Sequence, residues 1–346
     1  MAQSNQLKLV ESKLRDDHMT ETLSDETRQH SGLMDKAPFH SSFAEGPADG
    51  AAYWVHADDK VRLRVGLWQT ENANNGTVLL FPGRSEYIEN YGRTAVDLEK
   101  LGYATFAIDW RGHGLSDRLA KDPMIGHVRR FSDYQKDVTA MIQAAKELNL
   151  PKPWCLIGHS MGACIGLRAV IDGLPVAACA FTSPMWEIKM SPLERCAAWP
   201  LSWVAQALGK GDIYVPGVKR QTYVLSSPFE GNKMTHDPDM FQYWVNQAQT
   251  LSDLPTAGPS MGWLHEALKE CRSLSRVSSP NIPCIVFCAD KDEDINIRAI
   301  EDRMAGWPNG SCKLFQNSKH ELFLETPKIR GRVMTIIDEV FAAASS

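Results

Sequence analysis

The stretch that decides the fold reads Trp154-Cys-Leu-Ile-Gly-His-Ser-Met-Gly162. Its first four residues suit a buried strand, and residues 161–172 follow with helical spacing that Gly173 ends. Glycines flank Ser160, and a residue without a β-carbon permits a sharp, strained turn. A G-x-S-x-G run between a strand and a helix predicts that Ser160 is a nucleophile projecting from a sheet edge, rather than a solvated serine in a turn.

Strand and helix patterns alternate on both sides of this stretch. Short apolar runs predict strands at residues 77–81, 104–108, 176–182, 283–289 and 312–315. Helical spacing predicts helices at residues 86–101, 131–148, 161–172 and 328–344. Two earlier segments, 53–55 and 61–68, alternate like antiparallel strands. We therefore expect an α/β fold with a mostly parallel sheet and helices on both faces.

The pattern divides the chain into a tail, a core and an insertion. Residues 1–40 are polar, with one aromatic residue, and such a segment is typical of a disordered tail. Residues 185–277 break the alternation and predict a helical cap, inserted into a core made of residues 41–184 and 278–346. Inside the cap, an apolar helical face is expected to start after Pro200 and to stop at Gly209.

Composition excludes several classes of protein. The 346 residues carry 37 Lys and Arg against 42 Asp and Glu, a formal charge of −5, so a nucleic-acid partner is not expected. No apolar run is long enough for a transmembrane helix, and residues 1–10 lack a secretory apolar segment. The eight cysteines form no C-x-x-C pair and predict reduced thiols in the cytoplasm. The pair Cys284 and Cys288 lacks further ligands nearby, so no metal is expected.

A serine nucleophile needs a base, and the base needs an orienting acid. In a strand–turn–helix setting of this kind the chain order is serine, acid, histidine. His320 is the one histidine that follows the last predicted strand, so we expect it to be the base. Asp290, Asp292 and Asp294 all lie in the loop after residues 283–289, and alternation does not separate them.

The oxyanion of an acyl-transfer intermediate needs two backbone N–H donors. Met161, the residue after the nucleophile, is expected to supply one. The second is expected from the loop Pro82-Gly83-Arg84, with Arg84 as donor. The glycine-rich run 109–117 lacks the Lys-Ser/Thr ending of a phosphate-binding loop, so we interpret it as structural.

Several of these motifs together resemble the α/β-hydrolase superfamily, and within it the monoglyceride lipase and bacterial lysophospholipase branch. The matching motifs are Pro82-Gly83-Arg84, Asp109-Trp-Arg-Gly-His-Gly114, Gly158–Gly162, Asp292 and His320-Glu321, with Gly126-His-Val128, Phe131–Tyr134 and Gly258–Trp263. The resemblance implies an α/β-hydrolase fold and cofactor-free ester hydrolysis. The small-x-x-Asp-x-x-aliphatic pattern of related folds fits Ala289 to Ile295 and favours Asp292 over Asp290 as the acid.

The resemblance implies that Ser160 attacks an acyl ester while His320 accepts its proton. Monoglyceride lipases usually have His-Gly where this chain has Pro82-Gly83, and related chains have Gly where Ala289 stands. Both differences favour the lysophospholipase branch, with a monoacyl lipid as substrate and at most transient membrane contact through the cap. The alternatives are a short-chain or aromatic carboxylesterase and, more distantly, a non-catalytic binding protein of the same fold. The sequence does not indicate an oligomeric state.

Overall fold

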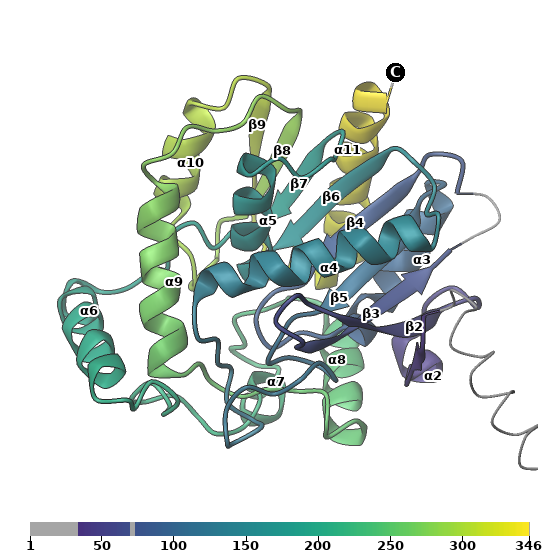
Figure 1. Ribbon diagram of the computed structural model, residues 1–346. Coiled ribbons are helices and arrows are strands. Elements are labelled where there is room, and N and C mark those ends of the chain that lie inside the picture. Colours follow the sequence, from purple (N-terminus) through teal and green to yellow (C-terminus); the bar gives the residue numbers. More distant parts are fainter. Residues whose placement is uncertain (1–33, 70–72, 346) are drawn as a thin grey trace, which may run out of the picture. The chain divides into compact units, whose positions relative to one another are not determined.

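The computed structural model describes residues 34–69 and 73–345, and its centre is a nine-stranded sheet (Figure 1). The strand order is β1-β2-β3-β5-β4-β6-β7-β8-β9. The strands are β1 (Lys36–Ala37), β2 (Ala51–His56), β3 (Arg62–Trp68), β4 (Thr77–Phe81), β5 (Ala104–Asp109), β6 (Trp154–His159), β7 (Cys179–Thr182), β8 (Cys284–Ala289) and β9 (Gly310–Phe315). In this order, the pairs β1-β2, β2-β3 and β3-β5 are antiparallel. Every later pair, from β5-β4 to β8-β9, is parallel. The predicted mostly parallel sheet is thus confirmed.

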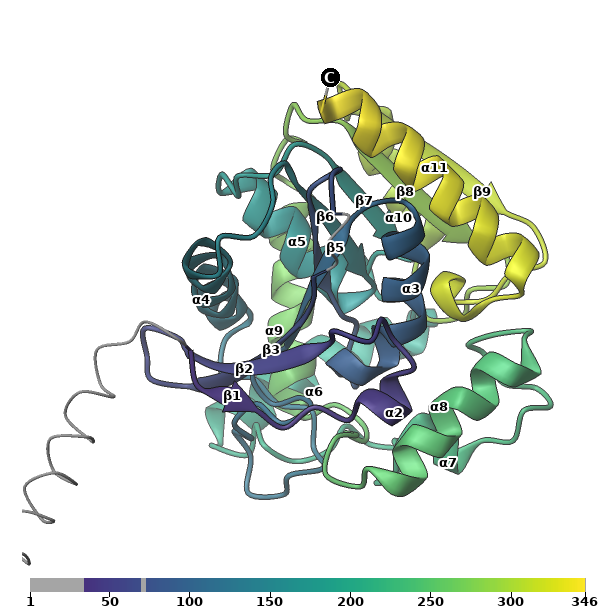
Figure 2. The same cartoon turned by 90° about the vertical axis from the view of Figure 1, so that its right-hand side faces the viewer.

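Helices cover both faces of the sheet, as the alternation predicted. Figure 2 shows α3 (Gly92–Lys100) and α11 (Pro327–Ser345) on one face, with α4 (Tyr134–Glu147) and α5 (Met161–Ile171) on the other. The apolar side chains of α3 and α11 join those of β4, β6 and β8 in one buried cluster. The remaining short elements of the core are α2 (Ser41–Ala44), η1 (Ile88–Tyr91), η2 (Phe131–Asp133), η3 (Leu322–Leu324) and α10 (Ile297–Ala305).

Several elements of the structure differ from the expectation. The helix expected over 86–101 is a 3-10 turn, η1, followed by α3, and the strand expected from residue 176 begins at Cys179. Helix α10, which Asn296 caps at its N-terminus, was not predicted. The tail expected over residues 1–40 falls largely outside the described residues. Its last part is folded here, because Lys36–Ala37 form β1 and pair with β2.

Four helices lie between β7 and β8, in the part of the chain expected to be a cap. They are α6 (Pro192–Ala207), α7 (Tyr223–Ser226), α8 (Pro238–Thr250) and α9 (Met261–Leu274). The expected helix start at Pro200 is wrong, because α6 begins at Pro192 and has Pro200 in its interior. Ser191 and Glu194 form a capping box at the true start, and a capping box with proline in the first turn is a strong start signal.

The apolar face of this helix is largely exposed. Leu201 is 53% exposed, Val204 44% and Leu208 67%, whereas Ala205 is buried. Helix α6 packs on α9, where the Trp199 and His265 ring centroids lie 5.7 Å apart and the hydroxyl of Ser202 lies 3.2 Å from Nδ1 of His265. No helix of the described residues is long and apolar enough to cross a membrane.

A short backbone clasp joins the core to the segment before α9. The Gly126 N–H donates to the Gly258 carbonyl at 3.1 Å, and the Ser260 N–H donates to the Gly126 carbonyl at 2.9 Å. Nδ1 of His127 lies 2.7 Å from the Ser260 hydroxyl. We call these contacts the Gly126 clasp. They join residues 126–127 to residues 258–260, which lead into α9.

Candidate active site

Ser160 occupies the sharp turn between β6 and α5, with φ of 48° and ψ of −113°. A β-carbon on Gly158 would lie 2.9 Å from Cα of Ala163, and one on Gly162 would collide with the Phe81 carbonyl oxygen. Both glycines are therefore required by close backbone approach. Ser160 is partly exposed, and within the described residues its hydroxyl has no hydrogen-bond partner. The turn thus presents a free hydroxyl, as the motif predicted.

His320 and Asp292 meet beside this turn. Nδ1 of His320 lies 2.7 Å from Oδ2 of Asp292, and both side chains are buried. The His320 ring lies 5.0 Å from that of His159, the residue before Ser160. Asp290 lies apart from this pair, since its Oδ1 accepts from the Ser318 N–H at 3.2 Å. The structure brings His320 together with Asp292 and not with Asp290.

Asp292 and His320 shift each other's pKa values. Burial alone would lower the pKa of His320, but the charge and hydrogen bond of Asp292 outweigh burial and raise it. Burial would raise the pKa of Asp292, and the facing imidazole lowers it instead. Asp292 also accepts from the Asp294 N–H at 2.9 Å. The Asp292 carboxylate therefore stabilises the imidazolium that would form if the His320 ring took a proton from serine.

The loop after β4 carries the expected second N–H donor. Within the described part of the chain, the N–H groups of Arg84 and Met161 have no hydrogen-bond partner. The Gly83 N–H is already committed to the Glu86 carboxylate. The Arg84 guanidinium reaches the segment before α9 instead, donating to the Ala257 carbonyl at 3.0 Å.

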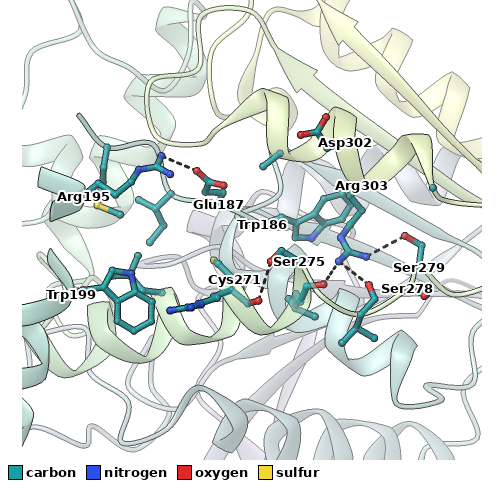
Figure 3. A pocket seen from close by; sticks show the side chains of 18 residues that line it. Trp186, Glu187, Arg195, Trp199, Cys271, Ser275, Ser278, Ser279, Asp302 and Arg303 are labelled. Atoms are coloured by element: carbon teal, nitrogen blue, oxygen red, sulfur yellow. Dashed lines mark hydrogen bonds and ion pairs between the residues drawn. The ribbon is translucent and has the colours of Figure 1, made fainter. Parts of the chain in front are cut away.

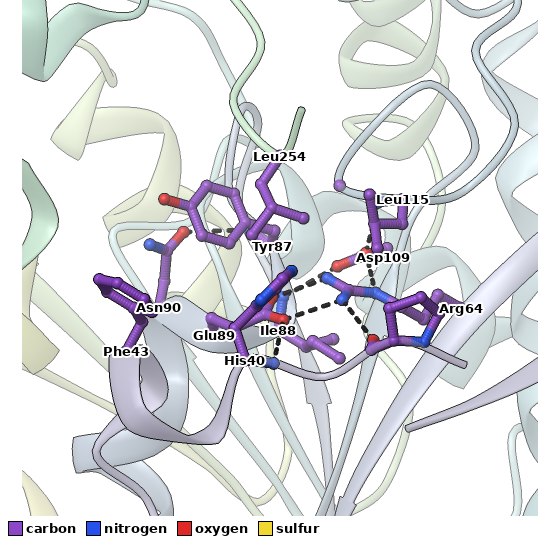
Figure 4. Close-up of polar contacts among 12 residues, drawn as sticks. His40, Phe43, Arg64, Tyr87, Ile88, Glu89, Asn90, Asp109, Leu115 and Leu254 are labelled. Carbon is purple, nitrogen blue, oxygen red and sulfur yellow. Dashed lines mark hydrogen bonds and ion pairs between the residues drawn. The ribbon is translucent and has the colours of Figure 1, made fainter. Parts of the chain in front are cut away.

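A buried ion network lies between β3, η1 and the end of β5 (Figure 4). Arg64 on β3 contacts both carboxylate oxygens of Glu89 at 2.7 and 2.8 Å, and its Nε lies 2.7 Å from Asp109. None of the three side chains is exposed. Asp109 also accepts from the Ile88 N–H at 2.8 Å and the Leu115 N–H at 2.9 Å. The network joins η1 to the end of β5, which agrees with the structural interpretation of residues 109–117.

Three buried polar residues next to the predicted site were missed by the sequence analysis. They are His159, Glu86 and Glu321, and each stands within two residues of a predicted functional residue. Oε1 of Glu321 lies 3.1 Å from Nε2 of His159. One ring nitrogen of His159, one ring nitrogen of His320 and one carboxylate oxygen of Glu321 lie within 4.8 Å of one another. The sequence offered one signal for these three residues, namely that each stands close in the chain to a predicted site residue. Their burial could not be predicted, because it depends on contacts between distant segments.

A cavity of about 740 Å³ does not include the predicted site residues (Figure 3). It lies between α6, α9 and α10, with Trp186 and Trp199 among its lining residues. Its cations are largely engaged. Arg303 donates to the Ser279 hydroxyl, and Arg195 pairs with Glu187 at 2.8 Å.

Comparisons with known sequences place this site in context. A family model described as serine aminopeptidase, S33 matches residues 72–327. The chain is 29% identical to lysophospholipase L2 of Escherichia coli over 324 residues, covering 87% of this chain and 92% of that protein. It is 24% identical to the monoacylglycerol lipase of Mycolicibacterium smegmatis over 281 residues, covering 77% and 88%.

Solved structures share the fold. A soluble variant of the Saccharomyces cerevisiae monoglyceride lipase superposes with a TM-score of 0.64 at 19% identity, over 84% of this chain and 94% of that one. The monoacylglycerol lipase of Paleococcus ferrophilus gives a TM-score of 0.62 at 17% identity, over 82% and 99%. The expected α/β-hydrolase fold is confirmed.

Proposed function

Because the chain belongs to the family described as serine aminopeptidase, S33, we propose that it is a serine hydrolase that cleaves carboxylic acyl esters. The observation that carries the proposal is the 2.7 Å contact of Asp292 with His320 beside the strained turn that holds Ser160. A serine on such a turn, a buried histidine and a buried carboxylate match the roles of nucleophile, base and orienter.

The reaction follows from these roles. His320 accepts the Ser160 proton while the serine oxygen attacks the ester carbonyl. The N–H groups of Arg84 and Met161, which have no other partner among the described residues, stabilise the tetrahedral oxyanion. His320 then protonates the leaving alcohol, and water releases the acid from the acyl-enzyme by the same route. No cofactor takes part in these steps.

The proposed substrate is a monoacyl lipid, either a lysophospholipid or a monoacylglycerol. The names of the relatives in Escherichia coli and Mycolicibacterium smegmatis support this substrate class. Exposed apolar side chains on α6 also support it, because Trp203 is 61% exposed and Leu193 80%. Such a surface fits transient contact with a lipid aggregate. Reduced thiols are proposed for the eight cysteines, which agrees with a cytoplasmic location.

The nucleophile is tested with a fluorophosphonate probe. The wild-type protein should be labelled, and Ser160→Ala should abolish the labelling. Full labelling of Ser160→Ala would refute the assignment. The control is Ser275→Ala, because the Ser275 hydroxyl lies on an exposed part of the chain and donates to the Arg272 carbonyl at 3.0 Å, and the variant should be labelled like the wild type.

The substrate class is tested by comparing hydrolysis of lysophosphatidylcholine, monoacylglycerol and p-nitrophenyl esters of graded chain length. We expect kcat/KM to rise toward long monoacyl substrates. A maximum at the shortest esters would instead favour a short-chain carboxylesterase. Sedimentation with liposomes measures the membrane contact, and tight binding would contradict its transient character.

A further inference from the structure

Two buried glutamates lie between the oxyanion loop and the histidine loop, and the proposed mechanism uses neither. Glu86 stands two residues after Arg84, and Glu321 directly follows His320. Glu86 is 3% exposed and Glu321 5%. Burying an ionised carboxylate is costly unless hydrogen bonds or charges compensate, so two together require an explanation.

Their contacts connect all three parts of the site. Oε2 of Glu86 accepts from the Gly83 N–H in the oxyanion loop and from the Tyr91 hydroxyl at 2.5 Å. The Glu86 and Glu321 carboxyl groups both face Nε2 of His159, which lies 3.8 Å from Oε1 of Glu86, and this places them close enough to share a proton. Oε1 of Glu321 lies 3.1 Å from Nε2 of His159, which precedes the nucleophile. One carboxyl pair therefore touches the oxyanion loop and the nucleophile turn, and it is attached to the base through the backbone.

A hydrogen bond between two carboxyl groups needs one proton, because two ionised carboxylates offer only acceptors. Two donors already point at Oε2 of Glu86, and such donors favour its ionised form. The pair is therefore assigned a single proton that the two carboxyl groups share.

Among the described residues, no lysine or arginine forms an ion pair with either carboxylate. The groups that face the pair are His159, Tyr91, Arg84, His320, Asp292 and Asp294. The Arg84 guanidinium is engaged with the Ala257 carbonyl. Burial lowers the pKa of His159 to about 4, so this ring is neutral at pH 7. Burial, followed by the charge of Glu321, raises the pKa of Glu86 to about 7, and burial raises that of Glu321 to about 7.

We propose that Glu86 and Glu321 are positioning residues that share one proton and thereby hold the Gly83–Arg84 backbone in register with Ser160 and His320. The inference rests on the proposed function of this site. Loss of the proton places two negative charges side by side in a buried space. Their repulsion displaces the loop, and a misplacement of about 1 Å can cost roughly 10²-fold in rate.

The pH profile of kcat tests this inference. In the wild-type protein, kcat should fall as the pH rises through about 7, because the pair loses its proton there. Glu321→Gln keeps a donor toward Glu86 but cannot ionise, so this alkaline fall should disappear. Glu321→Leu removes the donor and should lower kcat by roughly 10- to 100-fold, with KM changed less than about threefold. If kcat of Glu321→Gln stays close to that of the wild type, the loss in Glu321→Leu comes from the missing hydrogen bond to Glu86 and not from a change in side-chain volume.

The matched control is Glu325→Gln. Glu325 is also fully buried on this segment, but it accepts from the Lys319 N–H at 2.9 Å and pairs with His236, away from the oxyanion loop. The alkaline fall of kcat in Glu325→Gln should therefore have the same midpoint pH as in the wild-type protein. Circular dichroism and thermal melting establish that each variant is folded.

Two outcomes overturn the inference. The first is an alkaline midpoint in Glu321→Gln equal to that of the wild type, and the second is an unchanged kcat in folded Glu321→Leu. If the wild-type protein hydrolyses esters, either result overturns this inference and leaves the proposed function intact. A wild-type protein that is neither labelled at Ser160 nor active on any ester sinks the proposed function itself.

Discussion

Asp292→Asn is the sharpest test of the proposed acid. In the structure, the Asp292 carboxylate accepts from Nδ1 of His320 at 2.7 Å, so the proton of the neutral ring stays on Nδ1 and Nε2 can act as base. An amide at position 292 presents a donor as easily as an acceptor. When its NH2 group faces Nδ1, the ring proton moves to Nε2 and the base is lost.

The magnitude follows from two contributions. A hydrogen bond to a charged group is worth about 1.5–3 kcal/mol, and at about 1.4 kcal/mol per tenfold its loss alone costs roughly 10- to 150-fold in rate. Reversal of the tautomer raises the cost to about 10⁴-fold. We therefore expect kcat of Asp292→Asn to fall by between about 10² and 10⁴, with KM little changed.

The assay is steady-state hydrolysis of a p-nitrophenyl ester, with Asp290→Asn as the matched control. Asp290 contacts the Ser318 N–H and lies 3.7 Å from its neighbour Lys291, so its loss should change kcat by less than about threefold. A kcat for Asp292→Asn within tenfold of the wild type would refute the reasoning. A larger loss in Asp290→Asn would reassign the acid.

Three further outcomes concern stability, measured by urea unfolding. Gly162→Ala should destabilise the protein by about 1–3 kcal/mol because its β-carbon meets backbone, whereas Gly331→Ala, in a helix with open space, should stabilise it by about 0.5–1 kcal/mol. Arg64→Met leaves two buried carboxylates without their partner and should cost about 3–5 kcal/mol. The pKa of Glu321 rises from 4.5 in its ordinary state to about 7 in the fold, so the folded protein binds more protons in that window and loses stability as the pH rises through it. Glu321→Gln should flatten this fall, and an identical slope in both proteins would contradict the assignment.

The sheet and its order of elements could be predicted because the relevant signals are local. The strand at 154–157, the turn at Ser160 and the following helix each depend on neighbouring residues, and the structure places them within two residues of the expectation. The helix α6 was misjudged for a local reason as well. Pro200 is typical of a helix start, but the capping box at Ser191 and Glu194 marks the true start. Pro200 then lies inside the helix.

The parts that could not be predicted depend on long-range contacts. Alternation along the chain does not distinguish Asp290 from Asp292, because only the return of the chain after β9 brings His320 beside one of them. The Glu86 and Glu321 pair joins residues 235 positions apart, and no periodicity records such a meeting. The exposed face of α6 likewise reflects how little of that helix its neighbour α9 covers.

The Gly126 clasp has a consequence for how this chain can be recombined with its relatives. Its backbone hydrogen bonds run between residues 124–126 of the core and residues 257–260, so neither side is self-sufficient. A chimaera that exchanges residues 185–277 alone must reproduce this backbone path or leave polar groups unpaired on both sides. The natural unit of exchange is therefore discontinuous, and it includes the core loop together with the inserted helices.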